Sequence, residues 1–417
     1  MTPNHLRIAI AGSVDDGKST LVGRLLHDSK AVPADQYEAV ADASRRRGQD
    51  APDLALLTDG LRAEREQGIT IDVAYRYFAT PRRSFVLADT PGHAQYTRNM
   101  VTGASTADAV VVLVDARNGV VEQTRRHTAV AAVLRVEHVV LAVNKMDLVD
   151  YAEPVFTRIA AEFSSCASAL GISRTTAVPV CAVTGDNVVE PSSRMDWYAG
   201  PSLLEHLDTV AIGGGSGEES TRLPVQYVIR PRHGDVRDDR GYAGRLTAGA
   251  LRVGDAVTVL PSGRTSTVAA LDVLGVDARE VRAPQSVTVR LTDDLDVSRG
   301  DLIAPVADAP RVTRDIEATV CHLDERPLRA GDRVLLRHTT RTVRAVVTDI
   351  SSRLDLSDLS AEPSPGFLAA NDLGRLRIRT AEPIAVDAYA DQRGTGSFIL
   401  IDPADGATLT AGMTVKV

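Results

Sequence analysis

The chain has 417 residues, more than the about 100–200 residues of an ordinary single domain, so two or three domains are expected. Its composition, 44% hydrophobic and 24% charged, is typical of a soluble globular protein and excludes disorder of the whole chain. The net charge of −8 creates no overall field that would hold a polyanion, so nucleic acid is disfavoured as a partner.

The cysteines and the hydropathy of the chain indicate the cellular compartment in which it is expected. Cys166, Cys181 and Cys321 are scattered and form no CxxC pair, which argues against a zinc site or a disulfide framework. No stretch reaches the about 18 consecutive apolar residues of a membrane span, and no long apolar run precedes a cleavage site at the N-terminus. We therefore expect a cytoplasmic protein with no membrane contact.

The first half of the chain alternates short apolar, β-branched runs with helix-like stretches, which is typical of βαβ units around a mostly parallel sheet. Such strands are hydrophobic throughout because helices cover both faces of the sheet. Residues 1–212 are predicted to form this α/β domain. We place its strands at Arg7–Ala11, Phe85–Ala88, Val110–Asp115, Val139–Asn144 and Val178–Val183.

A glycine-rich loop follows the first predicted strand and opens a predicted helix. It reads GSVDDGKS and matches GxxxxGK[ST] in the strand–loop–helix context that makes this P-loop motif specific. Its amides would surround the β-phosphate at the helix N-terminus, while Lys18 reaches the β- and γ-phosphate oxygens and Ser19 ligates Mg²⁺. The predicted phosphate-binding residues here are Gly12, Ser13, Val14, Asp15, Asp16, Gly17, Lys18, Ser19 and Thr20.

A second motif, DTPGH, stands at the end of the strand SFVLAD. There Asp89 can hold Mg²⁺ through a water, and the Gly92 amide can contact the γ-phosphate. Thr70 lies between the two motifs, where its hydroxyl would complete the Mg²⁺ shell while its amide meets the γ-phosphate. The P-loop, Mg²⁺ and lysine only hold the phosphates, so His93 is predicted to be the catalytic residue that orients the attacking water.

The base is predicted from NKMD, which follows the strand VVLAV. Here Asn144, Lys145 and Asp147 are assigned to guanine. A carboxylate at Asp147 accepts hydrogen bonds from both N1–H and the 2-amino group of guanine, whereas adenine has an acceptor at N1 and no 2-amino group. The motifs together predict a GTP hydrolase with GTP and Mg²⁺ as its ligands.

The second half of the chain has a different sequence pattern, with a glycine-rich segment followed by short predicted strands. Residues 213–221 contain GGGSGEE and are predicted to be a flexible linker. Beyond the linker, short alternating strands are broken by turns such as VGD, PSGR and AGD. Two all-β barrel domains, at residues 222–309 and 310–417, fit typical domain sizes better than one larger barrel.

With these motifs in this order, the chain resembles the translation-factor superfamily of GTPases, which carry GxVDxGKST, GIT, DTPGH and NKxD before two β-barrels. Within that superfamily, DDGKSTLVGRLL, LALLTDGLRAEREQGITIDVAYRYF, DARNGVVEQTRRH and MDWYAGPSLLEHLDTV look like the GTPase subunit of the bacterial heterodimeric sulfate adenylyltransferase. The segments RGYAG and LTDDLDVSRGD, outside the nucleotide site, favour this family over the elongation factors.

This resemblance implies a heterodimer with a smaller catalytic subunit. That partner makes adenosine 5′-phosphosulfate and pyrophosphate from ATP and sulfate in sulfate assimilation, and GTP hydrolysis drives the unfavourable step. The resemblance also implies that Cys181, Ala182 and Val183 bind guanine, with the Ala182 amide donating to O6. The superfamily usually has Ser where Cys181 stands. Because the main contact is the Ala182 amide, Cys is expected to be tolerated there, with a weaker guanine affinity.

An elongation-factor-like GTPase that delivers aminoacyl-tRNA to the ribosome is the alternative function, since it uses the same three-domain frame. Arginine-rich stretches at Ser44–Arg47, Arg230–Arg240 and Arg337–Arg344 keep it open, because tRNA binding needs only one local basic surface. The plainer interpretation of each stretch is a solvated loop or strand face. A regulatory GTPase without a catalytic partner is the third possibility.

Overall fold

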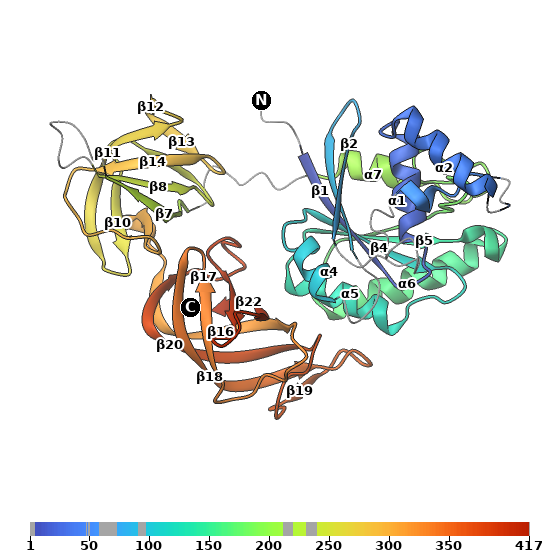
Figure 1. Cartoon of the computed structure of the whole chain (residues 1–417). Coiled ribbons are helices and arrows are strands. Elements are labelled where there is room, and N and C mark those ends of the chain that lie inside the picture. The colour runs from blue at the N-terminus through green and yellow to red at the C-terminus, as the bar shows by residue number, and fades with distance from the viewer. Residues whose placement is uncertain are drawn as a thin grey trace. The chain divides into compact units, whose positions relative to one another are not determined.

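The computed structural model describes residues 5–46, 48, 51–57, 73–90, 97–211, 220–230 and 240–416. The chain divides into two compact units, residues 1–212 with 355–360 and the rest of the chain from residue 213 (Figure 1). The predicted linker lies outside the described residues except for Ser220 and Thr221. Within the described part of the chain, no helix is both long enough and apolar enough to span a membrane.

A six-stranded sheet forms the centre of the N-terminal unit, in the order β2-β3-β1-β4-β5-β6. β2 is antiparallel to β3, and all other neighbours are parallel. The predicted α/β fold with a mostly parallel sheet is therefore confirmed. The strands are β1 (His5–Gly12), β2 (Ala74–Ala79), β3 (Ser84–Asp89), β4 (Ala109–Asp115), β5 (His138–Asn144) and β6 (Thr175–Pro179).

The position of β6 corrects the prediction of a strand at Val178–Val183. The strand begins earlier, at two β-branched threonines that pair with β5, and ends at Pro179. Val180 donates one further amide bond to the Val143 carbonyl at 2.8 Å, and the chain then leaves the sheet. Cys181 lies in the loop that follows yet is fully buried. An apolar run that continues into a buried loop therefore gave the wrong strand end.

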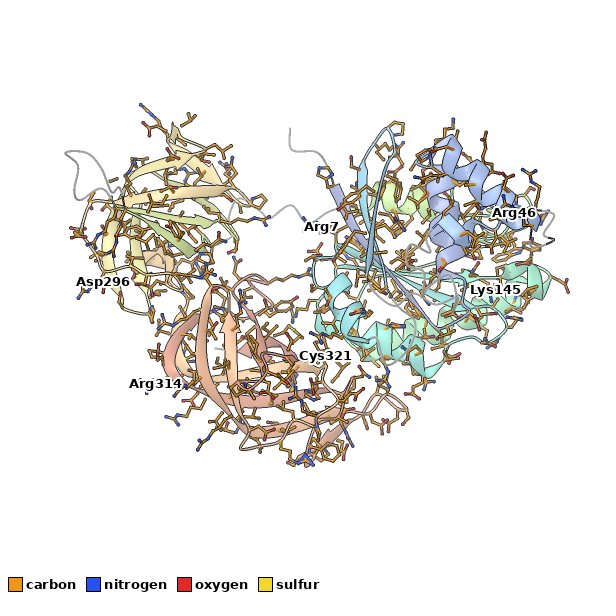
Figure 2. All side chains as sticks on the ribbon, viewed as in Figure 1. Arg7, Arg46, Lys145, Asp296, Arg314 and Cys321 are labelled. Carbon is orange, nitrogen blue, oxygen red and sulfur yellow. The ribbon has the colours of Figure 1, made fainter. Side chains whose placement is uncertain are left out.

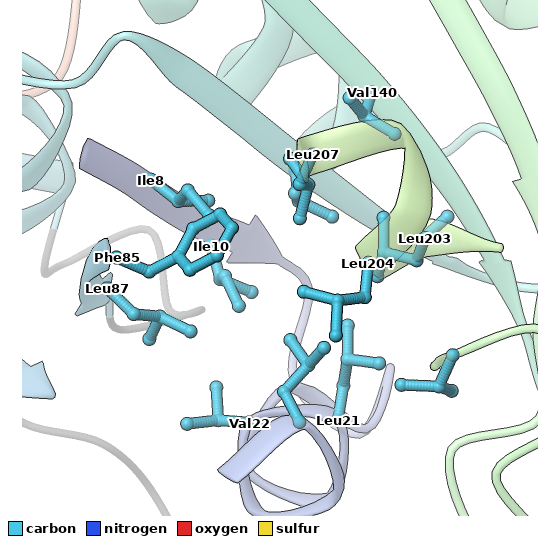
Figure 3. Packing of buried hydrophobic residues seen from close by; sticks show 14 of the residues in the cluster. Ile8, Ile10, Leu21, Val22, Phe85, Leu87, Val140, Leu203, Leu204 and Leu207 are labelled. Carbon is cyan, nitrogen blue, oxygen red and sulfur yellow. The ribbon is translucent and has the colours of Figure 1, made fainter. Parts of the chain in front are cut away.

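Helices cover the sheet through amphipathic faces. Figure 3 shows one such contact, in which Ile8 and Ile10 of β1 and Phe85 of β3 pack near Leu21 of α1 and Leu207 of α7. Burying each side chain of this kind contributes about 1.5–3 kcal/mol. The helices are α1 (Lys18–Asp28), α2 (Ala34–Arg46), α4 (Thr97–Ala104), α5 (Glu122–Val133), α6 (Glu153–Ala169) and α7 (Leu203–Thr209), with short 3₁₀ helices η1 (Leu54–Leu57) and η3 (Met146–Val149).

The second unit contains two closed antiparallel β-barrels, which confirms the predicted fold class. The first closes in the order β10-β15-β7-β8-β14-β11 through the β10–β11 pairing, and the second in the order β17-β21-β22-β16-β20-β18 through β17–β18. Closure removes the open sheet edges that would invite pairing with other chains.

The first barrel uses β7 (Leu223–Ile229), β8 (Gly241–Arg245), β10 (Ala256–Leu260), β11 (Arg264–Val273), β14 (Ser286–Leu291) and β15 (Leu302–Pro305), with the short strands β9 (Ala250–Arg252), β12 (Val276–Ala278) and β13 (Glu280–Arg282). After η4 (Val306–Asp308), the second uses β16 (Arg311–His322), β17 (Arg333–His338), β18 (Arg341–Leu354), β20 (Leu373–Val386), β21 (Ser397–Ile401) and β22 (Thr408–Lys416), with β19 (Ala361–Pro363) beside β18.

A buried ion pair joins the two barrels. Arg222, just before β7, donates through Nε and Nη2 to the two carboxylate oxygens of Asp387, each at 2.9 Å. Only 3% of the Arg222 side chain and 10% of the Asp387 side chain are exposed. The remaining Arg222 nitrogen, Nη1, donates to the Asp308 carbonyl at 2.8 Å. An apolar cluster continues the same contact, formed by Leu260, Leu302, Ala304 and Ala385.

Asp387→Asn should destabilise the two-barrel unit by about 3–5 kcal/mol, because the Arg222 guanidinium stays buried without its countercharge. Chemical unfolding of the whole chain, followed at a barrel-specific probe, measures the loss. The control is Asp315→Asn, whose ion pair with Arg379 is mostly exposed and spans 3.8 Å. Such a pair is worth at most about 1 kcal/mol. Equal losses in the two variants would contradict the role given to the buried pair.

Candidate functional site

Three strands of the sheet, two of them beside β1, end in a polar residue at the same edge. β3 ends in Asp89, β4 in Asp115 and β5 in Asn144, and each of these residues is only 2% exposed. Asp89 lies in register with Ile10 of β1, and Asp115 in register with Asn144. Open α/β sheets bind their ligands at this carboxyl edge. The strand ends therefore place these polar groups around the loop that leaves β1.

The predicted phosphate loop connects β1 to α1 as expected. Gly17 precedes the helix with φ 92°, and a Cβ at this position would meet Asn144 Nδ2 at 2.5 Å, so only glycine fits. Lys18 begins the helix, and its ammonium donates to the carbonyls of Gly12 at 2.8 Å and Ser13 at 2.7 Å. The side chain therefore folds back across the loop that is predicted to hold the phosphates.

Buried charges of both signs surround this loop, and burial has the largest effect on the pKa values of Asp16 and Lys18. Burial raises the pKa of Asp16, while the Ser13 amide, which donates to its carboxylate at 2.6 Å, and the Lys18 charge lower it. Burial lowers the pKa of the Lys18 ammonium, and the carboxylates of Asp89, Asp16 and Asp15 oppose that change. Attraction between Lys18 and a bound phosphate would be strong here, because little water is left to screen it.

Oxygen ligands suited to Mg²⁺ lie beside the loop. Ser19 is the second residue of α1, and Asp89 ends the strand next to β1, close enough to Lys18 to affect its pKa. A hydroxyl, a carboxylate and phosphate oxygens form the hard donor set that Mg²⁺ prefers, so the residues present fit this ion. Thr70, Gly92 and His93, which complete the predicted phosphate, metal and catalytic set, lie outside the described residues.

Asn144 joins the phosphate loop to the predicted guanine loop. Its Nδ2 donates to the Asp16 carbonyl at 2.7 Å, and its Oδ1 accepts from the Ala182 amide at 3.0 Å. The structure thus brings both predicted parts of the site together. The Ala182 amide, which the resemblance assigned to guanine O6, is bonded to a protein oxygen here, and its contact with guanine stays a prediction.

Asp147 and Cys181, both predicted to bind guanine, contact each other directly. The Cys181 thiol donates to Asp147 Oδ1 at 3.1 Å. Burial raises the pKa of this thiol, so it stays protonated and able to donate. Val183, the last residue of the predicted guanine segment, is 63% exposed. The thiol therefore steadies the carboxylate that is predicted to read the base.

Cys181→Ser should tighten the binding of GDP and GTP by about three- to tenfold, because a hydroxyl is a stronger donor than a thiol to the Asp147 carboxylate. Titration with a fluorescent GDP analogue measures the change. The control is Cys166→Ser on α6, where the substitution should leave nucleotide affinity unchanged. An unchanged or weaker affinity in Cys181→Ser would show that the thiol contact does not limit binding.

Two charged side chains of this site were missed by reasoning from the sequence. Arg24 on α1 donates to the Ala182 carbonyl at 3.1 Å and also to the Val183 carbonyl, so it connects the helix after the predicted phosphate loop to the predicted guanine loop. Asp115 binds Lys145 at 3.0 Å. A signal for Asp115 was present in the sequence, because it ends the apolar run AVVVLVD just as Asn144 ends HVVLAVN.

Comparison with known proteins identifies the family. The elongation factor Tu GTP binding domain family matches residues 3–212, and the GTP-eEF1A C-terminal domain-like family matches residues 315–415. Sulfate adenylyltransferase subunit 1 of Bacteroides fragilis is 47% identical over 412 residues, which cover 98% of this chain and 86% of that protein. This chain belongs to the sulfate adenylyltransferase subunit 1 family.

Other proteins are similar to this chain over nearly its whole length. The Aeromonas salmonicida subunit 1 is 46% identical over 413 residues, covering 99% of this chain and 87% of that protein. The bifunctional enzyme CysN/CysC of Mycobacterium tuberculosis strain H37Rv is 53% identical over 412 residues, so 99% of this chain matches 67% of that protein. A solved structure of sup35 complexed with GMPPNP covers 100% of this chain at 24% identity and a TM-score of 0.45.

Proposed function

We propose that this chain is the GTPase subunit of a sulfate adenylyltransferase. GTP hydrolysis in its N-terminal domain drives the synthesis of adenosine 5′-phosphosulfate and pyrophosphate from ATP and sulfate by a smaller catalytic subunit. The observation that carries the proposal is the match to subunit 1 relatives at 46–47% identity over 98–99% of this chain, barrels included. A match limited to the nucleotide domain would serve an elongation factor equally well.

Each part of the nucleotide has residues proposed to bind it. The loop amides and Lys18 hold the phosphates, and Asp147 with Asn144 reads guanine. Ser19, Asp89 and Thr70 would hold Mg²⁺, with Asp89 acting through a water. When bound, the ion would supply positive charge near the phosphate oxygens.

Hydrolysis transfers the γ-phosphoryl group to water. The water oxygen forms a bond to the γ-phosphorus while the bond to the β–γ bridging oxygen breaks, leaving GDP and phosphate. His93 is proposed to orient that water, and Lys18 to stabilise the negative charge that develops on the bridging oxygen. The role of His93 rests on the DTPGH motif alone.

Coupling to sulfate activation is proposed to run through the conformation of this subunit. The phosphate–sulfate anhydride is a high-energy bond, so its synthesis needs the free energy of GTP hydrolysis. Thr70 and the DTPGH segment contact the γ-phosphate in this proposal, so their contacts with the partner change when GTP becomes GDP. The adenylyl transfer itself takes place in the partner subunit.

Reconstitution of this chain with the small catalytic subunit tests the proposal. Adenosine 5′-phosphosulfate and pyrophosphate should accumulate with GTP, and far less with GDP or a non-hydrolysable GTP analogue. Equal product yield with and without GTP would remove the coupling. GTP-dependent capture of aminoacyl-tRNA by the chain, with no effect on sulfate activation, would instead favour the elongation-factor-like function.

A further inference from the structure

The carboxylate of Asp115 is buried among cationic groups at the end of β4. Its Oδ1 accepts from the Arg117 amide at 2.9 Å and from Arg117 Nε at 3.0 Å. Its Oδ2 accepts from Arg117 Nη2 at 2.6 Å and from Lys145 Nζ at 3.0 Å. Burial raises the pKa of Asp115, but the hydrogen bonds from Arg117 and Lys145 outweigh it and lower the value to about 2. The group is therefore a buried anion with both oxygens satisfied.

Lys145 connects this anion to the phosphate loop. The same ammonium that pairs with Asp115 also donates to the Asp15 carbonyl, and Figure 2 marks Lys145 in the N-terminal unit. Asp15 has φ 64° and Lys145 has φ 62°, so both adopt the left-handed conformation that non-glycine residues rarely take. Each costs about 1–2 kcal/mol and persists only where its surroundings hold it in place. The two strained residues are thus bonded to each other, and Asp115 anchors the bond.

The turn after β4 does not depend on the link to Lys145. The amides of Asn118 and Gly119 donate to the backbone carbonyl of Asp115, each at 3.0 Å. These bonds close the turn through the main chain. The carboxylate adds a connection to a segment thirty residues further along the chain, where the predicted guanine-binding motif begins.

Arg117 is the second cationic residue, besides Lys145, that contacts the Asp115 carboxylate. Half of its side chain is exposed, in contrast to the buried Asp115. The hydrogen bonds that Arg117 donates to Asp115 raise the pKa of Arg117 most, and attraction to Asp147 adds to the increase. Arg117 therefore lies within electrostatic reach of the carboxylate that is predicted to read guanine.

We propose that Asp115, with Arg117, is a positioning residue of the nucleotide site. It holds Lys145, and through Lys145 the phosphate loop, in the conformation that receives the nucleotide. This inference rests on the proposed GTP binding and is independent of sulfate activation. Because Asp115 acts before the nucleotide reacts, it affects the affinity for GDP and GTP alike and leaves hydrolysis of bound GTP unchanged.

Asp115→Asn tests the proposal, since an amide of the same shape removes the charge that holds Lys145. The dissociation constants of fluorescent GDP and GTP analogues should each rise about tenfold or more, with turnover at saturating GTP unchanged. Unchanged dissociation constants would overturn the proposal. So would a loss of turnover at saturating GTP without a change in affinity.

A double-mutant cycle with Lys145→Met separates positioning from a general structural role. If Asp115 acts through Lys145, adding Asp115→Asn to Lys145→Met should change nucleotide affinity less than about twofold. Effects that multiply would show that Asp115 acts independently of Lys145. The control is Asp42→Asn on α2, which breaks an exposed ion pair with Arg45 and should leave affinity unchanged.

Arg117→Gln provides a second test should Asp115→Asn fail to fold. It loosens Asp115 without removing the carboxylate, so the dissociation constants should rise severalfold, and unchanged values would overturn the proposal. Failure of the proposed GTP binding would give a different result from failure of this inference. In that case the chain without any substitution would bind no guanine nucleotide.

Discussion

Asp147→Asn should change the nucleotide preference of this chain from GTP to XTP. An amide nitrogen in place of a carboxylate oxygen presents a donor to the donors of guanine, whereas xanthine has a carbonyl in place of the 2-amino group and can accept from it. Sites that hydrogen-bond a substrate group reject an analogue without that group by about 10⁴–10⁵-fold. The affinity of Asp147→Asn for GTP should therefore fall by about 10³-fold or more. Competition of GTP and XTP against labelled nucleotide measures the change.

The structure favours correct folding of this variant. The contact that Asp147 makes with the Cys181 thiol needs only an acceptor oxygen, and asparagine keeps one. Asp150→Asn, at an exposed position in the same segment, is the control and should keep the preference for GTP. GTP binding at the original strength by Asp147→Asn would show that another group reads the base.

His93→Ala should keep nucleotide binding but lower GTP turnover by about 10²–10⁴-fold, the usual contribution of a positioned group that handles the attacking water or its proton. The phosphate loop, Lys18 and the guanine contacts are untouched by this change. Single-turnover release of phosphate from bound GTP measures the chemical step, and the affinity for a GDP analogue reports on binding.

The matched control for His93→Ala is His5→Ala, which removes an exposed imidazole at the start of β1. That variant should hydrolyse GTP at the original rate. Near-normal turnover in His93→Ala would move the catalytic role to another group, while lost nucleotide binding would mean that His93 shapes the site instead.

Features that depend on local pattern were predictable from the sequence. β1, β3, β4 and β5 are apolar, β-branched runs, and each was predicted to within two residues of its observed ends. The place of the predicted phosphate loop between β1 and α1 was predictable because the motif specifies a strand–loop–helix in consecutive residues. The two barrels were predictable from alternating strands and turns.

Features that depend on contacts between distant segments were not predictable. Arg24 reaches a carbonyl at Ala182, 158 residues away in sequence, and nothing near Arg24 indicates that partner. Asp115 and Lys145 meet because β4 and β5 pair in register, a fact that emerges only when the sheet forms. β2 was missed because its exposed side chains lack the apolar pattern of the strands buried in the sheet.

The ion pair between Arg222 and Asp387 lies where the chain enters the barrels from the predicted linker. Ser220, at the end of that linker, is held by Gln392 of the second barrel, while Arg222 precedes the first strand of the first barrel. The chain is therefore attached to both barrels before β7 begins. A pull on the chain at this point would act on both barrels together. A partner bound to either barrel would therefore resist it.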